Sequence, residues 1–117
     1  MSVVSNEIYV IIKELFPHNV LIKEYYVKYK GTRLFFDFFI KDLKILIEVQ
    51  GEQHTRFVEH FHGDKDGFNK SKFRDNLKIE YAQEQGVAFV RFYYNEKITK
   101  KVIMSKLYKA IEESYNE

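Results

Sequence analysis

The middle of the chain holds three successive segments whose residues favour β-strands, and apolar and polar residues alternate in the third of them. Residues 20–27, 33–40 and 44–50 are rich in β-branched and aromatic side chains, and short polar segments at 30–32 and 41–43 separate them. Because connections this short join neighbouring antiparallel strands, the pattern predicts a meander of three strands.

Helical spacing appears on both sides of this meander. Ser5 is placed to cap a first helix, and Gly86 is placed to end a second helix over residues 68–85. The apolar residues that recur at four-residue spacing in the second helix are Phe73, Leu77 and Tyr81. A fourth strand is expected over 87–93 and an amphipathic surface helix over 99–115. The predicted order is αβββαβα, an α/β fold with a mixed sheet of about four strands.

A polar segment separates the third strand from the second helix. Residues 51–67 hold three of the five glycines and three of the four histidines. This composition predicts a long irregular loop at the end of the third strand, and loops of that length are often functional.

Composition limits the class of protein. With 117 residues, 45% of them hydrophobic, the chain is long enough for one packed domain and too short for two ordinary ones. The net charge of +2 is too small to indicate a polyanionic partner by itself, and the absence of Cys excludes disulfides and thiolate zinc sites. Because we find neither a membrane-spanning apolar stretch nor a signal peptide, we expect a cytoplasmic protein without membrane contact.

Two acidic residues stand out in the apolar strands. Asp37 interrupts residues 33–40, and alternation places Glu48 and Gln50 together on one face of the third strand. A carboxylate in so apolar a run is costly to bury unless it is paired or binds a cation, so two carboxylates on neighbouring strands favour a divalent metal. The alternative is a pair of solvated acids at strand ends.

A carboxylate-bound Mg²⁺, or Mn²⁺ in its place, suits the hydrolysis of a phosphodiester. Asp37, Glu48 and the backbone carbonyl of Val49 are the expected metal ligands. The Gln50 amide is expected to orient the attacking water or to bind a phosphate oxygen, and His54 is the candidate for proton transfer or a further ligand. The chain has no Gly-rich phosphate loop, which disfavours a nucleotide-binding enzyme.

These residues resemble the PD-(D/E)xK nuclease superfamily, and the element order is similar to its restriction-endonuclease-like αβββαβ core. Two segments, Glu48-Val-Gln-Gly-Glu-Gln-His54 and Arg74-Asp-Asn-Leu-Lys78, are similar to the very-short-patch-repair-like branch and to small phage or mobile-element endonucleases. The resemblance covers most of the chain. It implies a Mg²⁺-dependent DNA-cleaving domain in a bacterial or phage-infected cell.

The resemblance also implies roles for single residues. Asp37 and Glu48 correspond to the metal ligands, and Gln50 occupies the usual Lys position, a departure that removes a charge which would stabilise the phosphate. Glu7 resembles the family's acid in the first helix, and Asp75 is expected near the site, where orienting His54, pairing with Lys78 or facing solvent are the alternatives.

Basic residues on the second helix are the expected DNA contacts. Lys70, Arg74 and Lys78 follow one another at four-residue spacing and suit a phosphate-binding stripe, although a solvated helix face fits equally well. His60 and His62 lack a third ligand for zinc, so contact with the substrate is expected instead.

The function expected from these observations is a metal-dependent DNA endonuclease. Without an appended domain to read sequence, its specificity is expected from DNA structure, such as a nick, junction or mismatch. A homodimer or larger assembly would allow double-strand cleavage, whereas a monomer suffices for nicking. The rival is an inactive nuclease-like module that binds DNA or protein, such as a phage accessory factor, which the Lys-to-Gln departure at position 50 keeps open.

Overall fold

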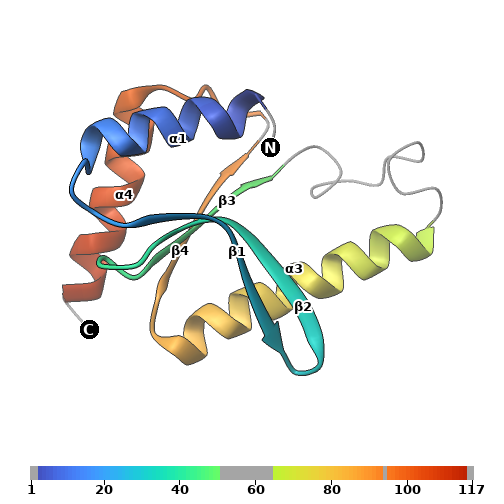
Figure 1. The fold of residues 1–117 in the computed structure, drawn as a ribbon. Helices are drawn as coiled ribbons and strands as arrows, with labels where there is room; N and C mark the ends of the chain where they lie inside the picture. Colours follow the sequence, from blue (N-terminus) through green and yellow to red (C-terminus); the bar gives the residue numbers. More distant parts are fainter. Residues whose placement is uncertain (1–2, 51–64, 94, 116–117) are drawn as a thin grey trace.

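The computed structural model describes residues 3–50, 65–93 and 95–115, which form three helices around a four-stranded sheet (Figure 1). The strands pair in the order β1-β2-β3-β4, antiparallel up to β3 and parallel between β3 and β4. The elements are α1 (Val3–Leu15), β1 (Leu21–Tyr29), β2 (Thr32–Ile40), β3 (Ile45–Gln50), α3 (Lys65–Gln85), β4 (Ala88–Tyr93) and α4 (Lys100–Tyr115). The predictions of an α/β fold and a mixed sheet of about four strands are therefore confirmed.

The residues placed at turns behave as their chemistry requires. Lys30 and Gly31 both have positive φ, as a tight hairpin turn between β1 and β2 demands. Gly86 has a φ of 67°, its N–H donates to the Gln83 carbonyl and the Val87 N–H donates to the Ala82 carbonyl. These two bonds are the Schellman arrangement that ends a helix, so the predicted stop of α3 is confirmed.

Two local predictions on the helices were wrong. Helix α1 begins at Val3, so Ser5 lies inside its first turn, because the type of a cap residue fixes a helix start only to within a residue or two. Helix α3 begins at Lys65, so residues 65–67 are helical, whereas 51–64 lie outside the described residues. Phe73 is 59% exposed, since α3 packs through a neighbouring face.

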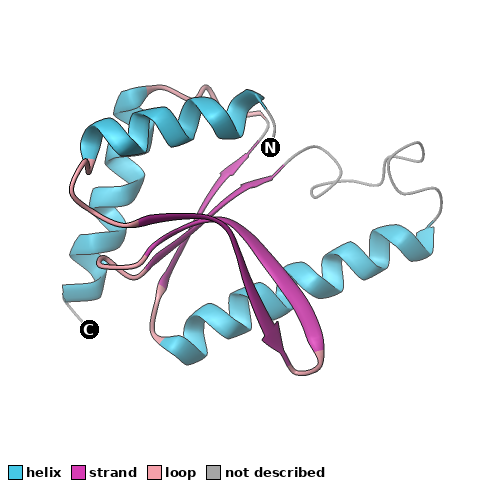
Figure 2. Cartoon of the chain, in the orientation of Figure 1, coloured by secondary structure: helices cyan, strands magenta, loops and turns pink. Residues whose placement is uncertain are grey.

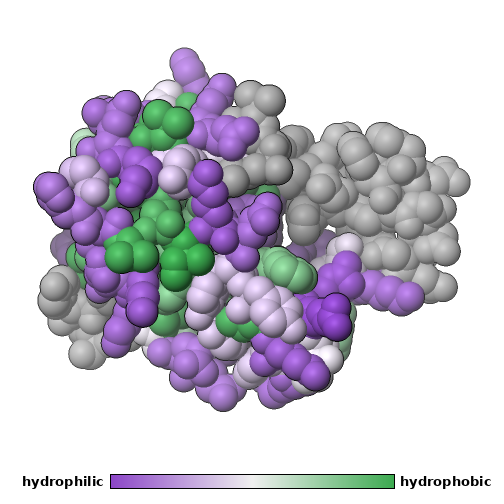
Figure 3. Space-filling view, in the orientation of Figure 1, coloured by the Kyte–Doolittle hydropathy of each residue, from purple (hydrophilic) through white to green (hydrophobic). Residues whose placement is uncertain are grey.

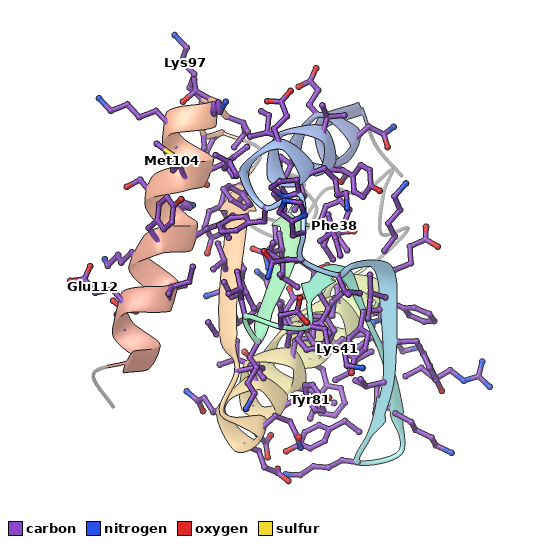
Figure 4. The ribbon with its side chains drawn as sticks, turned by 60° about the vertical axis from the view of Figure 1, so that its left-hand side comes forward. Phe38, Lys41, Tyr81, Lys97, Met104 and Glu112 are labelled. Carbon is purple, nitrogen blue, oxygen red and sulfur yellow. The ribbon has the colours of Figure 1, made fainter. Side chains whose placement is uncertain are left out.

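The sheet is covered on both faces (Figure 2). Helices α1 and α4 pack on one face around an entirely apolar core, in which Phe38 lies beneath α1 (Figure 4). Helix α3 packs on the other face, where Tyr81 lies beside the β1–β2 hairpin. Strand β3 lies between these layers, and all its residues except Val49 are buried.

The β1–β2 hairpin changes sides part way along its length. Phe38 and Ile40 belong to the core under α1 and α4, yet Phe36, on the same side of a regular strand, belongs to the core under α3. At the change, Glu24 has a φ of 51° and, by the strand register, lies opposite Asp37. Asp37 therefore occupies the irregular point where the hairpin twists from one layer to the other.

The tip of the hairpin is fastened to α3. The Tyr29 hydroxyl donates to the Glu84 carboxylate, and Lys30 forms an ion pair with Glu80. The hydrogen bond to Glu84 raises the pKa of Tyr29, and the bond to Glu80 raises the pKa of Lys30. These contacts hold the end of α3 nearest Gly86 against the sheet and so set which side chains of the helix face β3.

The outer surface is mainly hydrophilic in the view of Figure 3, with a smaller apolar area below α1. Among the described helices, none combines the length and the apolar character needed to cross a membrane.

Candidate functional site

The two carboxylates singled out by the sequence lie where β2 and β3 separate. Pairing between these strands ends at Phe38 and Ile47, and one further step of the same register places Asp37 opposite Glu48. The Asp37 side chain takes over the hydrogen bonding there, because its Oδ2 accepts the Val49 N–H at 2.7 Å. The separation of the strands thus opens a space that both carboxylates border.

Glu48 is buried and forms an ion pair with α3. Its side chain is 9% exposed, and its Oε2 lies 2.6 Å from Nζ of Lys78, whose side chain is 11% exposed. The Lys78 ammonium also lies 5.4 Å from the centre of the Phe36 ring. Removing two charges from water costs several kcal/mol for each ion, and the attraction within the pair often does no more than offset this cost. Stability alone therefore does not explain why an ion pair is buried here.

Asp37, Glu48 and Lys78 line one pocket. It has a volume of about 370 Å³ and is lined by side chains of β1, β2, β3 and α3. The charged residues that line it are Glu24, Asp37, Glu48 and Lys78. Within the described part of the chain, no three His, Asp or Glu side chains gather closely enough to hold an ion by themselves. An ion held by Asp37 and Glu48 would have to take its remaining ligands from water and substrate, as Mg²⁺ does.

The backbone of Val49 lies beside the Asp37 carboxylate. In an extended strand the N–H and C=O of one residue point to the same side. Because the Val49 N–H points to the Asp37 carboxylate, its carbonyl faces the same gap between β2 and β3. The structure thus brings the two predicted carboxylate ligands to one pocket and places the Val49 backbone beside Asp37.

Gln50 and Asp75 line a second pocket next to the first. Gln50 is 5% exposed and Asp75 is 9% exposed. Their pocket measures about 310 Å³ and also receives the side chains of Arg91 and Tyr93 from β4. A larger cavity of about 480 Å³ runs along the outer edge of β4 and contains neither Asp37 nor Glu48.

The expected phosphate-binding stripe on α3 is divided between two environments. Lys70 and Arg74 are exposed, whereas Lys78 is buried against Glu48. Glu7 is exposed on α1, which covers the opposite face of the sheet, and it does not line the pocket of Asp37 and Glu48. His54, His60 and His62 lie outside the described residues.

Two residues near the site were not predicted from the sequence. Arg91 is the Cα partner of Glu48 in the parallel pairing of β3 with β4. Its charge inside an apolar strand, like that of Asp37, could have marked it as a candidate site residue. Glu24 borders the first pocket only because the hairpin changes sides at its positive φ, and the sequence carries no signal for that.

Proteins of three viruses are similar to part of this chain. Uncharacterized protein 307L of Invertebrate iridescent virus 6 is 31% identical over 71 residues, and uncharacterized protein 033L of Invertebrate iridescent virus 3 is 30% identical over 69 residues. Uncharacterized protein 094L of Frog virus 3 (isolate Goorha) is 35% identical over 68 residues. The matched stretches cover 61%, 59% and 57% of this chain, in the same order.

The chain spans less than half the length of these relatives, since the matches cover 36%, 36% and 44% of them. No protein-family description and no solved structure matches the chain. The comparisons therefore relate this chain to viral proteins. A relationship to phage or mobile-element proteins was expected, and the viral part of that expectation agrees with these matches.

Proposed function

We propose that this chain is a metal-dependent endonuclease of the restriction-endonuclease type that hydrolyses phosphodiester bonds in DNA. The observation that best supports the proposal is the buried contact of 2.6 Å between Lys78 and Glu48 in the pocket that Asp37 also lines. The superfamily resemblance places a Lys at position 50, where this chain has Gln50. Helix α3 brings the Lys78 ammonium into the pocket of Asp37 and Glu48, where it would supply the positive charge that Gln50 lacks.

The carboxylates of Asp37 and Glu48 and the Val49 carbonyl would hold the ion. Bound there, Mg²⁺ or Mn²⁺ supplies charge stabilisation for the phosphoryl oxygens and activates a water molecule. The two carboxylates come from adjacent strands of a packed sheet, so their positions are set by the core and not by a loop. Such rigid placement is what a site for charge stabilisation requires.

Lys78 has two tasks in this proposal. In the free protein its ammonium holds the Glu48 carboxylate in place through a charge-assisted hydrogen bond. When substrate is bound, the same ammonium is a compact positive charge beside the scissile phosphate. The Phe36 ring next to Nζ keeps water from one side of the group and so strengthens its electrostatic effect.

The test is cleavage of a nicked or branched oligonucleotide duplex, and of supercoiled plasmid, in Mg²⁺ or Mn²⁺. Asp37→Asn and Glu48→Gln should each lower the cleavage rate by about a hundredfold or more. Asp37→Asn retains an oxygen for the Val49 N–H, so loss of activity in this variant would not reflect lost backbone pairing. Circular dichroism and thermal denaturation show whether each variant is folded.

Matched substitutions elsewhere separate the site from general effects of charge. Asp42→Asn in the β2–β3 turn and Glu112→Gln on α4 make the same chemical changes at exposed positions and should cleave at the wild-type rate. Cleavage by Asp37→Asn at the wild-type rate would disprove the proposed site. A wild-type protein that binds DNA equally with and without the ion, and cuts neither substrate, would establish the rival binding module.

A further inference from the structure

The pocket beside the proposed metal site has the features of a ligand-binding site of its own. It lies between α3 and the ends of β3 and β4 and has a volume of about 310 Å³. The polar and aromatic residues that line it are Gln50, Lys72, Asp75, Asn76, Arg91 and Tyr93. Neither Asp37 nor Glu48 lines this pocket, so the proposed metal chemistry does not account for it.

Arg91 is a half-buried cation that lines this pocket and also the larger cavity along β4. Its guanidinium carbon lies 5.4 Å from the centre of the Phe89 ring and 6.0 Å from that of Tyr93. Although Arg91 is the Cα partner of Glu48, it makes no ion pair with any residue in the described part of the chain. Aromatic contacts fix the plane of a guanidinium but leave its charge uncompensated, so this pocket suits an anionic ligand.

Gln50 is a second, independent indication that this pocket binds a ligand. It is 5% exposed and lines the pocket, yet its side-chain amide makes no hydrogen bond to the residues that the structure describes. Buried amides are nearly always hydrogen-bonded, because burial without a partner is costly. An oxyanion in the pocket would accept the bond that this amide has to offer.

The other polar residues of the pocket are less suited than Arg91 and Gln50 to bind an anion. Lys72 and Asp75 each already have a partner within the protein. Asn76 is exposed at the rim, where its amide adds a further donor. An anion that enters the pocket thus meets a guanidinium fork from β4 and an amide from β3, a geometry suited to two oxygens of one phosphate.

We propose that this pocket is a phosphate subsite, in which Arg91 and Gln50 bind the phosphodiester group next to the one that is cleaved. This inference rests on the proposed function for the role of the neighbouring pocket. Gln50 and Glu48 lie on the same face of β3, two residues and roughly 6.6 Å apart along the strand. Two phosphates of one nucleic-acid strand would then occupy adjoining pockets, and the subsite would set the register of the strand over the metal ligands.

The first test measures binding of a fluorescein-labelled nicked duplex in EDTA, so that no cleavage intervenes. Affinity is measured by anisotropy over a range of salt concentrations. Arg91→Met should weaken binding and should reduce the slope of log K against log salt by about 0.9, the loss of one phosphate contact. Gln50→Leu should weaken binding by about five- to tenfold and leave the slope unchanged. Arg33→Met, at an exposed position on β2, is the matched control and should match the wild-type slope.

The second test locates the phosphate. A single neutral methylphosphonate linkage is moved along the labelled strand one position at a time. At one position it should weaken binding by the wild type as much as Arg91→Met does, and at that position it should not weaken Arg91→Met further. This lack of additivity identifies the contacted phosphate, and thermal denaturation of each variant excludes a loss of fold as the cause.

The outcomes separate this inference from the proposed function. An unchanged slope for Arg91→Met, additive losses at every position, or no binding by the wild type at low salt would overturn the subsite. If the slope falls as expected but the wild type cuts no DNA in Mg²⁺ or Mn²⁺, the subsite holds and the nuclease proposal fails. If the wild type cuts DNA while Arg91→Met binds with the wild-type slope, the nuclease stands and the subsite is wrong.

Discussion

The two faces of strand β3 differ in chemistry although they belong to the same six residues. One face carries Ile45 and Ile47, which are at most 1% exposed and pack in an apolar core with α1 and α4. The other face carries Leu46, Glu48 and Gln50 and is covered by α3. Both faces are buried, so burial alone does not explain why one is apolar and the other carries a charge and an amide.

The difference teaches which face stabilises the fold and which face carries chemistry. Burial of Ile47 stabilises the folded state by removing apolar surface from water. Burial of Glu48 requires Lys78 as a partner, and burial of Gln50 leaves its amide without a hydrogen bond in the described residues. Groups that cost stability where they stand are the expected signature of a functional site. The following substitutions test this contrast.

The largest effect on stability is expected for Lys78→Met. It removes one partner of a buried ion pair and leaves Glu48 charged, at a cost of about 3–5 kcal/mol. Urea denaturation at pH 7 measures this loss. The double variant Lys78→Met, Glu48→Gln should recover most of it, because neither side chain then carries a charge. A double variant as unstable as Lys78→Met alone would show that Lys78 acts through packing and not through its charge.

On the apolar face, Ile47→Ala should cost about 3 kcal/mol through lost burial and the cavity that it leaves. Ile47→Val removes one methylene group and should cost about 1 kcal/mol. Both variants are compared with the wild type by urea denaturation, and DNA affinity is measured below the unfolding transition. Affinity should remain at the wild-type value, and a loss of affinity in Ile47→Val would contradict the division of roles between the faces.

Much of this contrast was predictable from sequence. Alternation along residues 44–50 placed Glu48 and Gln50 on one face, and the short turn after β2 made Asp37 a neighbour. These predictions depended on the period of two in a strand and on short connections, which are local properties of the chain. The element order followed from the same local patterns.

The position of Lys78 was not predictable from such patterns. Its four-residue spacing from Arg74 grouped it with exposed residues, but successive steps of four turn by roughly 40° around a helix axis. Two such steps from Lys70, a turn of roughly 80°, bring Lys78 onto the buried face with Asp75 and Ala82. Which face of α3 meets β3 depends on contacts distant in sequence, such as the bond of Tyr29 to Glu84. The change of sides in the hairpin at Glu24 is likewise a tertiary effect.

A smaller effect, of opposite sign, is expected for Gln50→Leu. Leucine has a similar volume and leaves no unpaired amide, so the variant should gain about 1 kcal/mol in free energy of unfolding. Thermal and urea denaturation measure the gain, with Gln83→Leu at an exposed position on α3 as the matched control. Destabilisation by Gln50→Leu would mean that the amide has a partner in the folded chain.

The smallest effect concerns Glu96, which joins the end of β4 to α4 outside the proposed site. Lys106 donates to the Glu96 carboxylate at 2.7 Å and to the Arg91 carbonyl at 2.7 Å, and the Tyr93 N–H also donates to Glu96. Burial raises the pKa of Glu96, but the bonds from Lys106 and Tyr93 outweigh it and leave the pKa below 4.5.

Because the folded state lowers this pKa, the contribution of Glu96 to stability is present above pH 4.5 and is lost as the pH falls through the folded value. Glu96→Gln should therefore be less stable than the wild type at pH 7, by at most about 1 kcal/mol, and the difference should shrink toward pH 3. Thermal denaturation across this pH range measures the stability of both proteins, with Glu112→Gln at an exposed position on α4 as the matched control. A difference that stays unchanged as the pH falls below 4.5 would assign the loss to packing, because the stability that comes from a lowered pKa must shrink below the ordinary value.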